Sequence, residues 1–171
     1  MVVRNVRKND FPFIIKMYKD AYSEIRTNPK FGDYVRLQKP SASYFKKWAI
    51  NMYKEVQTGN AICVVAEENK KVVGSCFVIK RDMPDSEVSH VGVLRIVVDR
   101  NWRGKGIGTC LLDQVIKKSS KKFDIIELYT LAFNKAKRLY KRFGFRTWGV
   151  APGYIKRGKR YIDLEYMYLK L

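Results

Sequence analysis

The segment at residues 97–108 constrains the fold more than any other part of this chain. It reads Val-Val-Asp-Arg-Asn-Trp-Arg-Gly-Lys-Gly-Ile-Gly, so strand-forming residues enter a glycine-rich turn, and an apolar helical pattern follows. Three glycines in the turn lack the Cβ that blocks close backbone approach: Gly104, Gly106 and Gly108. Successive N–H groups can therefore converge on phosphate oxygens at the positive end of the next helix, and the charges of Arg103 and Lys105 strengthen that attraction. This pattern predicts a phosphate-binding loop.

Two common phosphate loops do not fit this segment. The NTPase pattern GxxxxGK[ST] is absent from the chain. The dinucleotide pattern GxGxxG fails because the glycines run G-x-G-x-G and Thr109 follows Gly108. An ordinary strand-to-helix turn remains the plain alternative to a phosphate site.

A second pattern lies downstream, at residues 136–145, and reads Ala-Lys-Arg-Leu-Tyr-Lys-Arg-Phe-Gly-Phe. In its plainest interpretation it is a short amphipathic helix that stops at Gly144. One face of that helix carries Ala136, Leu139, Tyr140 and Phe143.

The two patterns together resemble the hallmarks of the GNAT acetyltransferase superfamily. The first hallmark is R-x-x-G-x-G on Arg103, Gly106 and Gly108, and the second is A-x-x-L-Y-x-x-x-G-F at residues 136–145. The resemblance implies an α/β (α+β) fold. Its mixed, mostly antiparallel seven-stranded sheet is flanked by about four helices, and a central strand pair splays apart. It also implies an N-acetyltransferase that moves the acetyl group of acetyl-CoA by direct attack to a primary amine, which is a protein N-terminus, a lysine or a small amine.

The resemblance also implies which residues meet coenzyme A. The backbone of Ile96, Val97 and Val98 pairs with the pantetheine arm like an extra strand. The pyrophosphate sits on the amides of Arg103, Gly104, Lys105, Gly106, Ile107, Gly108 and Thr109. Tyr140 aligns with the tyrosine that protonates or hydrogen-bonds the departing thiolate in many relatives, a role that suits a phenol with a pKa near 10. Relatives place an asparagine three residues before the alanine of the second motif, but here that position is Phe133, so Asn134 either reaches the pantetheine from a shifted turn or caps the helix.

The attacking amine has to be neutral, and relatives commonly supply a base from the strand that leads into the glycine loop. That strand offers His90, the single histidine of the chain, and Glu87 near its start. A strand histidine bonded only to backbone is an equally good interpretation of His90. Asp163 and Glu165 on the last strand are further candidates.

Length and composition favour one domain over residues 1–171, with 46% apolar residues to form a core. There is no apolar run of 18 residues, and charge interrupts the N-terminus, so we expect a cytoplasmic protein without a membrane segment. Three cysteines without a C-x-x-C pair, Cys63, Cys76 and Cys110, predict packed, reduced thiols. With a single histidine and no ligand cluster, no metal is implied.

The net charge of +19 is more than one anionic cosubstrate requires. RNA, DNA or the ribosome is therefore a candidate partner, and a lysine-rich surface suited to high temperature is the alternative. In a competing hypothesis the fold is a basic nucleic-acid-binding module with little turnover. Its phosphate contacts would be Lys117, Lys118, Lys121, Lys122, Lys135, Lys137, Arg138, Lys141 and Arg142. A monomer and a homodimer are both compatible with the sequence.

Periodicity predicts the remaining elements. Strands are expected at residues 2–6, 61–67, 72–80, 88–98, 125–131, 145–150 and 161–169, with room for a bulge in the strand at 88–98. Helices are expected from Asp10 to about residue 25, from Ser41 or Ser43 to before Gly59, after the glycine loop, and around Tyr140. The loop at 27–40, the second helix and a turn at 149–160 should carry acceptor specificity.

Overall fold

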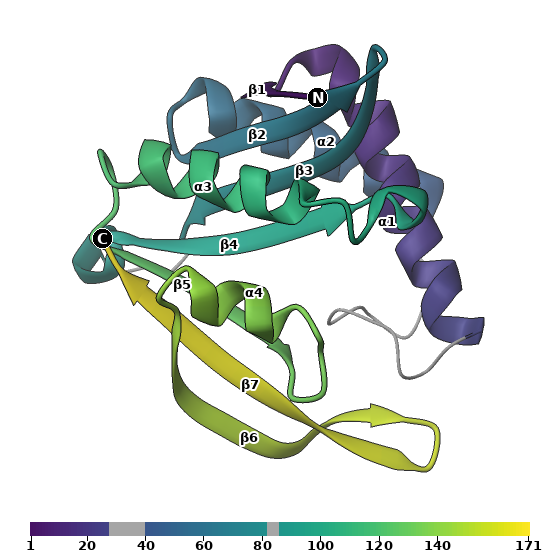
Figure 1. The fold of residues 1–171 in the computed structure, drawn as a ribbon, viewed down its shortest axis with the longest axis vertical. Coiled ribbons are helices and arrows are strands. Elements are labelled where there is room, and N and C mark those ends of the chain that lie inside the picture. The colour runs from purple at the N-terminus through teal and green to yellow at the C-terminus, as the bar shows by residue number, and fades with distance from the viewer. Residues whose placement is uncertain (28–39, 82–85) are drawn as a thin grey trace.

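The fold is seen in a computed structural model that describes residues 1–27, 40–81 and 86–171 (Figure 1). Its α-helices are α1 (Phe11–Thr27), α2 (Ala42–Gln57), α3 (Ile107–Ser119) and α4 (Lys137–Arg142). Its strands are β1 (Val2–Asn5), β2 (Ala61–Glu68), β3 (Lys71–Lys80), β4 (Val91–Val98), β5 (Ile125–Leu131), β6 (Arg146–Arg157) and β7 (Arg160–Lys170). Short 3-10 turns lie at Lys8–Asp10, Ser86–Val88 and Arg100–Trp102.

Within these residues the strands form one seven-stranded sheet in the order β1-β2-β3-β4-β5-β7-β6. Neighbouring strands run antiparallel except for β4 and β5, which are parallel. The predicted mixed, mostly antiparallel sheet is therefore confirmed. The β6–β7 hairpin projects beyond the rest of the sheet (Figure 1).

Helices cover both faces of the sheet. α3 and α4 lie on one face, where Leu111, Leu112 and Val115 of α3 join the larger core cluster. α1 and α2 lie on the other, where Ile14 and Met52 pack in the second cluster with β2 and β3. α2 begins as predicted, because the Ser41 hydroxyl accepts a hydrogen bond from the Tyr44 N–H at 3.1 Å.

The strand expected at residues 88–98 is shorter than predicted. Ser86–Val88 forms a 3-10 turn, so β4 begins only at Val91. Its register with β3 is continuous from Lys80↔Gly92 to Gly74↔Val98, so the strand pairs with β3 without the bulge for which its predicted length left room. The irregularity lies instead between Ala66 and Glu67, in the pairing of β2 with β3.

The strand and turn expected at residues 145–160 also need correction, because β6 runs on to Arg157. β6 is the edge strand of the sheet, where the missing N–H of Pro152 costs no ladder hydrogen bond. Gly153 takes a left-handed φ of 61° and donates its N–H to Asp163 Oδ1 at 2.8 Å, which carries the strand through a break in register. The hairpin turn is thus confined to the two residues after Arg157.

Three smaller expectations concern cysteines, membranes and metals. Cys63, Cys76 and Cys110 are free thiols, and burial raises the pKa of Cys63 and Cys76. In the part of the chain that the structure describes, no helix is long and apolar enough to cross a membrane. The same part contains no group of three or more His, Cys, Asp or Glu side chains arranged to hold a metal ion.

Candidate active site

The two central strands of the sheet separate partway along their length. β4 and β5 are paired only at Val91↔Ile125, Gly92↔Ile126 and Val93↔Glu127. Beyond this point β4 keeps its pairing with β3 as far as Val98, and β5 keeps its pairing with β7 as far as Leu131. β4 therefore remains paired with β3, and β5 remains paired with β7, after the pairing between β4 and β5 has ended. The two central strands splay apart, as the resemblance implied.

A cavity of about 70 Å³ lies at this splay. It is lined by Tyr18, Leu94, Arg95, Ile96, Leu128, Tyr129 and Tyr140. Four of these residues belong to the core cluster beneath α3 and α4: Leu94, Ile96, Leu128 and Tyr140. Side chains alternate along a strand, so Arg95 and Tyr129 face the opposite side of the sheet, where α1 contributes Tyr18. The cavity thus has an apolar side beneath α3 and α4 and a polar side next to α1.

Tyr140 is the predicted catalytic residue that the structure places at this cavity. It is buried, with 4% of its surface exposed, and its ring centroid lies 6.0 Å from that of Phe145. The L-Y-x-x-x-G-F motif explains its position, because α4 is a short helix that stops before Gly144, whose φ is 88°. The motif therefore holds the phenol at the apolar side of the splay.

The glycine-rich loop ends at an open helix terminus. Gly104 and Gly106 take left-handed φ values of 77° and 79°, and a Cβ built on either would meet no atom within 4 Å among the described residues. Gly106 is the N-cap of α3 and provides no side-chain cap. The first N–H groups of α3 are thus left for a ligand, at the end of the helix that favours anions.

Two basic residues of the loop are engaged in contacts. The Arg103 guanidinium donates to both carboxylate oxygens of Glu24, at 2.7 and 2.9 Å, and to the Val98 carbonyl at 3.0 Å. Its charge is therefore balanced by α1, contrary to the expectation that it adds free charge to the loop. Lys105 lies over the Trp102 ring, with Nζ 4.6 Å from the centroid.

The other predicted coenzyme A contacts lie along the same edge. No strand of the described chain pairs with the β5-facing side of β4 beyond Val93, which leaves the backbone of Ile96 and Val97 beside the opening. Ile107, Gly108 and Thr109 form the first turn of α3. The Thr109 hydroxyl accepts a hydrogen bond from Arg142 Nη2 at 3.3 Å, which links α3 to α4.

Asn134 has both ends of its side chain engaged. Its Nδ2 donates to Thr130 Oγ1 at 2.8 Å, and its Oδ1 accepts from the Ala136 N–H at 2.9 Å. These bonds stabilise the turn between β5 and α4. The N-cap of α4 is Ala136 and has no side-chain cap, so Asn134 does not cap the helix as one of the two alternatives expected.

The structure does not bring the predicted bases to the cavity. His90 is exposed at the start of β4, where its carbonyl accepts from the N–H groups of Asp124 and Ile125. It lies four residues before Leu94, which is roughly 13 Å along a strand. Glu87 is exposed in the 3-10 turn that precedes it, and it does not line the cavity.

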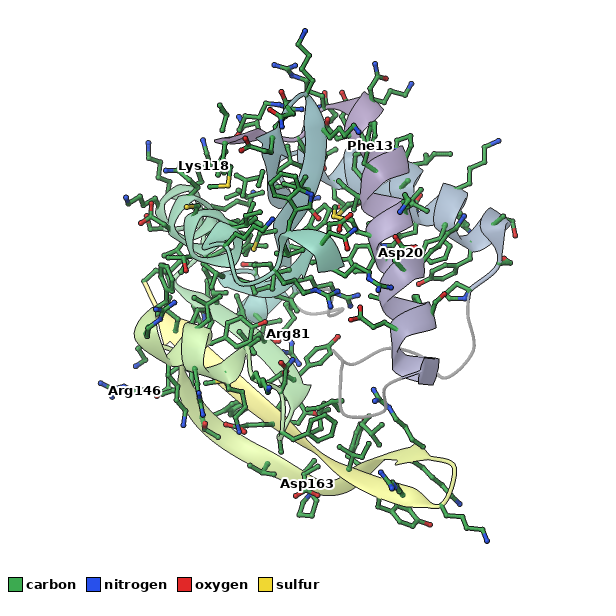
Figure 2. All side chains as sticks on the ribbon, turned by 45° about the vertical axis from the view of Figure 1, so that its right-hand side comes forward. Phe13, Asp20, Arg81, Lys118, Arg146 and Asp163 are labelled. Atoms are coloured by element: carbon green, nitrogen blue, oxygen red, sulfur yellow. The ribbon has the colours of Figure 1, made fainter. Side chains whose placement is uncertain are left out.

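The two acidic residues of β7 are engaged elsewhere. Asp163 is exposed and accepts from Gly153, and it lies on the hairpin away from the helices (Figure 2). Glu165 is buried and accepts from Lys137 Nζ at 2.5 Å and from Thr147 Oγ1 at 2.6 Å. Burial alone raises the pKa of Glu165, but the hydrogen bonds from Lys137 and Thr147 outweigh it and hold the pKa below its usual range.

The polar side of the cavity contains residues that the sequence analysis did not select. Arg95 donates to the Tyr129 hydroxyl at 3.2 Å. Nearby, Arg81 forms an ion pair with Glu127, and Figure 2 shows Arg81 near the centre of the molecule. The sequence held one signal for this group, because Arg95 interrupts the otherwise apolar run Val-Leu-Arg-Ile-Val-Val. The specificity loop expected at 27–40 lies almost wholly outside the described residues.

The candidate phosphate contacts on α3 and α4 include two lysines in ion pairs and three exposed lysines. Lys117 pairs with Asp113 one turn away at 2.9 Å, and Lys137 pairs with Glu165. Lys118, Lys121 and Lys122 are exposed around the end of α3. These placements match solvated helix faces.

Comparison with known proteins identifies the family to which the splay, the glycine loop and the tyrosine point. The GNAT acetyltransferase domain profile matches residues 59–147, which is more than half of the chain. This chain belongs to the GNAT acetyltransferase family. An uncharacterized N-acetyltransferase of Methanocaldococcus jannaschii is 32% identical over 161 residues, or 92% of this chain. The chain spans 66% of that relative's length.

Solved structures share the GNAT fold over the whole chain. A ribosomal-protein-alanine N-acetyltransferase from Brucella melitensis superposes with a TM-score of 0.85 at 22% identity and covers 100% of both chains. YncA from Salmonella typhimurium, solved with its cofactor acetyl-CoA, has a TM-score of 0.85 at 20% identity, and the match covers 99% of this chain and 92% of that chain. The GNAT arrangement of strands and helices is therefore the fold of this chain.

Proposed function

We propose that this GNAT protein transfers the acetyl group of acetyl-CoA to a primary amine. The observation that carries the proposal is the splay of β4 from β5, with Tyr140 at its apolar side and the open N-terminus of α3 at its end. The splay accommodates an extended thioester carrier, Tyr140 is a proton donor, and the N-terminus of α3 attracts phosphate.

The coenzyme portion lies on the α3 and α4 side in this proposal. The N–H groups from Gly104 to Thr109 bind the pyrophosphate, and the exposed backbone of β4 binds the pantetheine arm. A phosphate at a helix N-terminus gains roughly 0.3–1 kcal/mol from the helix dipole, before its direct hydrogen bonds are counted. Glycine at positions 104 and 106 leaves the space that such a ligand needs.

Acetyl-CoA supplies an activated acyl group whose carbonyl carbon accepts the amine nitrogen while the C–S bond breaks. Tyr140 donates its phenolic proton to the departing sulfur, so the leaving group departs as a thiol rather than a thiolate. The attacking nitrogen loses one proton to solvent as the amide forms, and the Tyr140 phenolate takes a proton back from solvent. The amine enters from the side of Tyr18, Arg95 and Tyr129. The positive charge of Arg95 lowers the pKa of a neighbouring ammonium group, which increases the neutral fraction of the acceptor.

The function is tested by incubating the purified protein with acetyl-CoA and a panel of amines. Thiol release is followed with a colorimetric reagent, and the acetylated product is detected by mass spectrometry. We expect amine-dependent release of one thiol per acetylated amine. A folded protein that binds acetyl-CoA and releases no thiol with any amine of the panel would refute the proposal.

A further inference from the structure

We infer that the amine acceptor is a free α-amino acid whose carboxylate pairs with Arg95 at the polar side of the cavity. This inference rests on the proposed acetyl transfer and assigns a substrate class to it. Its basis is the placement of one arginine and the charges around it.

Arg95 is in an unusual place for a charged side chain. It lies in β4, an interior strand of the sheet whose other residues from Val91 to Val98 are all apolar or glycine. Charged residues are rarely fully buried in such strands without a partner, and the Arg95 side chain is exposed at this position. The end of the β4–β5 ladder gives its side chain an exit to solvent, and it lines the cavity there.

Among the residues that the structure describes, the neighbouring arginines form ion pairs with carboxylates, whereas Arg95 forms none. Arg81 pairs with Glu127, and Arg103 pairs with Glu24. Within the described residues, the side-chain hydrogen bond of Arg95 goes to the neutral hydroxyl of Tyr129 at 3.2 Å. The polar side of the cavity therefore carries an uncompensated positive charge with a planar fork of N–H donors.

A carboxylate is the anion that such a fork binds best, because its two oxygens match two parallel N–H groups. In an α-amino acid the carboxylate and the amine are attached to the same carbon. A carboxylate held by Arg95 thus keeps the amine within a few bond lengths of the splay, on the side opposite Tyr140.

The same pairing assists the chemistry. In a free amino acid the negative carboxylate favours the protonated, unreactive form of the amine. Neutralisation of the carboxylate by Arg95 removes that effect, so the pKa of the bound ammonium falls. Polyamines and lysine side chains have no carboxylate next to the reacting amine, and polyamines add further positive charge. A peptide N-terminus has a neutral amide in place of the carboxylate.

The test compares matched acceptors that differ only at the carboxylate. L-phenylalanine, L-leucine and L-alanine are each assayed beside their amides and the corresponding decarboxylated amines, and a peptide beginning with alanine is included. The amide and the decarboxylated amine both lack the negative charge of the carboxylate. The ammonium group of the amide has a lower pKa than that of the amino acid, so without any contact to Arg95 the amide would be the more reactive acceptor. We expect at least one amino acid to have a kcat/KM about 10- to 100-fold above its amide, the range that charge-assisted hydrogen bonds provide.

Variants of Arg95 test whether the preference for a carboxylate depends on this arginine. Arg95→Gln is expected to remove the discrimination: the kcat/KM of the amino acid should fall to about that of its amide, mainly through a higher KM, while acetyl-CoA still binds. Arg95→Lys keeps the charge without the fork and should recover part of the preference. Arg146→Gln, an exposed arginine at the start of β6, is the matched control and should behave like the wild type.

Two outcomes overturn the inference while leaving acetyl transfer intact. One is equal or better turnover of the amides, amines or alanine peptide relative to the amino acids. The other is a carboxylate preference that survives in Arg95→Gln. Failure of the proposed function is a different result, in which no acceptor is acetylated.

Discussion

Glu24 and Arg103 join helix α1 to the glycine-rich loop, with both carboxylate oxygens of Glu24 within 2.9 Å of Arg103 Nη1. Both side chains are largely sheltered from solvent, with 18% and 29% of their surfaces exposed. Arg103 also bonds the Val98 carbonyl at the end of β4. One guanidinium therefore fixes three segments: the last turns of α1, the end of β4 and the start of the loop proposed to bind pyrophosphate.

Glu24→Gln should loosen this junction. The amide keeps one acceptor but loses the charge, so we expect unfolding free energy to fall by about 0.5–1.5 kcal/mol in urea titrations. Acetyl-CoA binding should weaken as well, because the loop loses one of its anchors. Asp20→Asn on the same helix removes an exposed ion pair with Lys16 and should leave stability and affinity almost unchanged. Equal behaviour of the two variants would contradict a role for Glu24 in holding the loop.

Gly106→Ala should separate backbone strain from ligand binding. Its left-handed φ imposes a cost of roughly 1–2 kcal/mol on any residue with a Cβ. Gly158→Ala is a matched control, because Gly158 has a φ of 60° and open space around its Cβ position in the β6–β7 turn. Both variants should lose similar stability in thermal unfolding, but only Gly106→Ala should bind acetyl-CoA more weakly. A comparable loss of affinity in both would rule out a specific role for the loop.

Tyr140→Phe tests the proton donor. The ring is buried against Phe145, so removal of the hydroxyl should leave the fold intact. We expect kcat to fall by roughly 100-fold or more, with little change in the KM for acetyl-CoA. Tyr53→Phe, in which the ring packs on Phe11 away from the cavity, controls for loss of a hydroxyl. Unchanged kcat in Tyr140→Phe would show that another group or solvent protonates the sulfur.

Glu165 should make stability depend on pH. Burial raises its pKa, but the hydrogen bonds from Lys137 and Thr147 prevail, so the folded-state pKa lies below the unfolded one. A lowered carboxylate pKa contributes stability above the unfolded value of about 4.3, and this contribution is lost as pH falls through the folded pKa. Glu165→Gln should therefore be less stable than the wild type by about 1–3 kcal/mol at pH 7, and the gap should narrow below about pH 4.

Chemical denaturation of both proteins across this pH range measures the gap. Asp124→Asn, an exposed residue after α3, serves as the control and should track the wild type. A gap between wild type and Glu165→Gln that stays constant down to pH 3 would mean that Glu165 is not the titrating group.

Much of the fold follows from sequence because local pattern and tertiary environment agree. Ser41 caps α2, apolar spacing defines the buried face of α3, and glycines mark the loop before it. The predicted boundaries were wrong where the tertiary environment, rather than the local sequence pattern, determines where an element ends. β6 continues past Pro152 because the strand lies at the sheet edge, and edge position is not visible in a local pattern.

The site could be predicted only in part for a similar reason. The motifs locate Tyr140 and the α3 terminus, since each depends on residues adjacent in the chain. Where the β4–β5 ladder ends depends on two strands separated by a helix, and this point decides which strand residues border the cavity. His90 and Arg95 lie on the same predicted strand, but Arg95 lies beyond the end of the ladder and lines the cavity, whereas His90 lies before it.

The most direct test of the account is a calorimetric titration of the purified protein with acetyl-CoA. We predict saturable binding at a single site per chain, weakened in Gly106→Ala and retained in Gly158→Ala and Tyr140→Phe. No heat of binding for acetyl-CoA or free coenzyme A, with the fold shown intact by circular dichroism, would contradict the central claim that the α3 loop and the β4–β5 splay form a cosubstrate site.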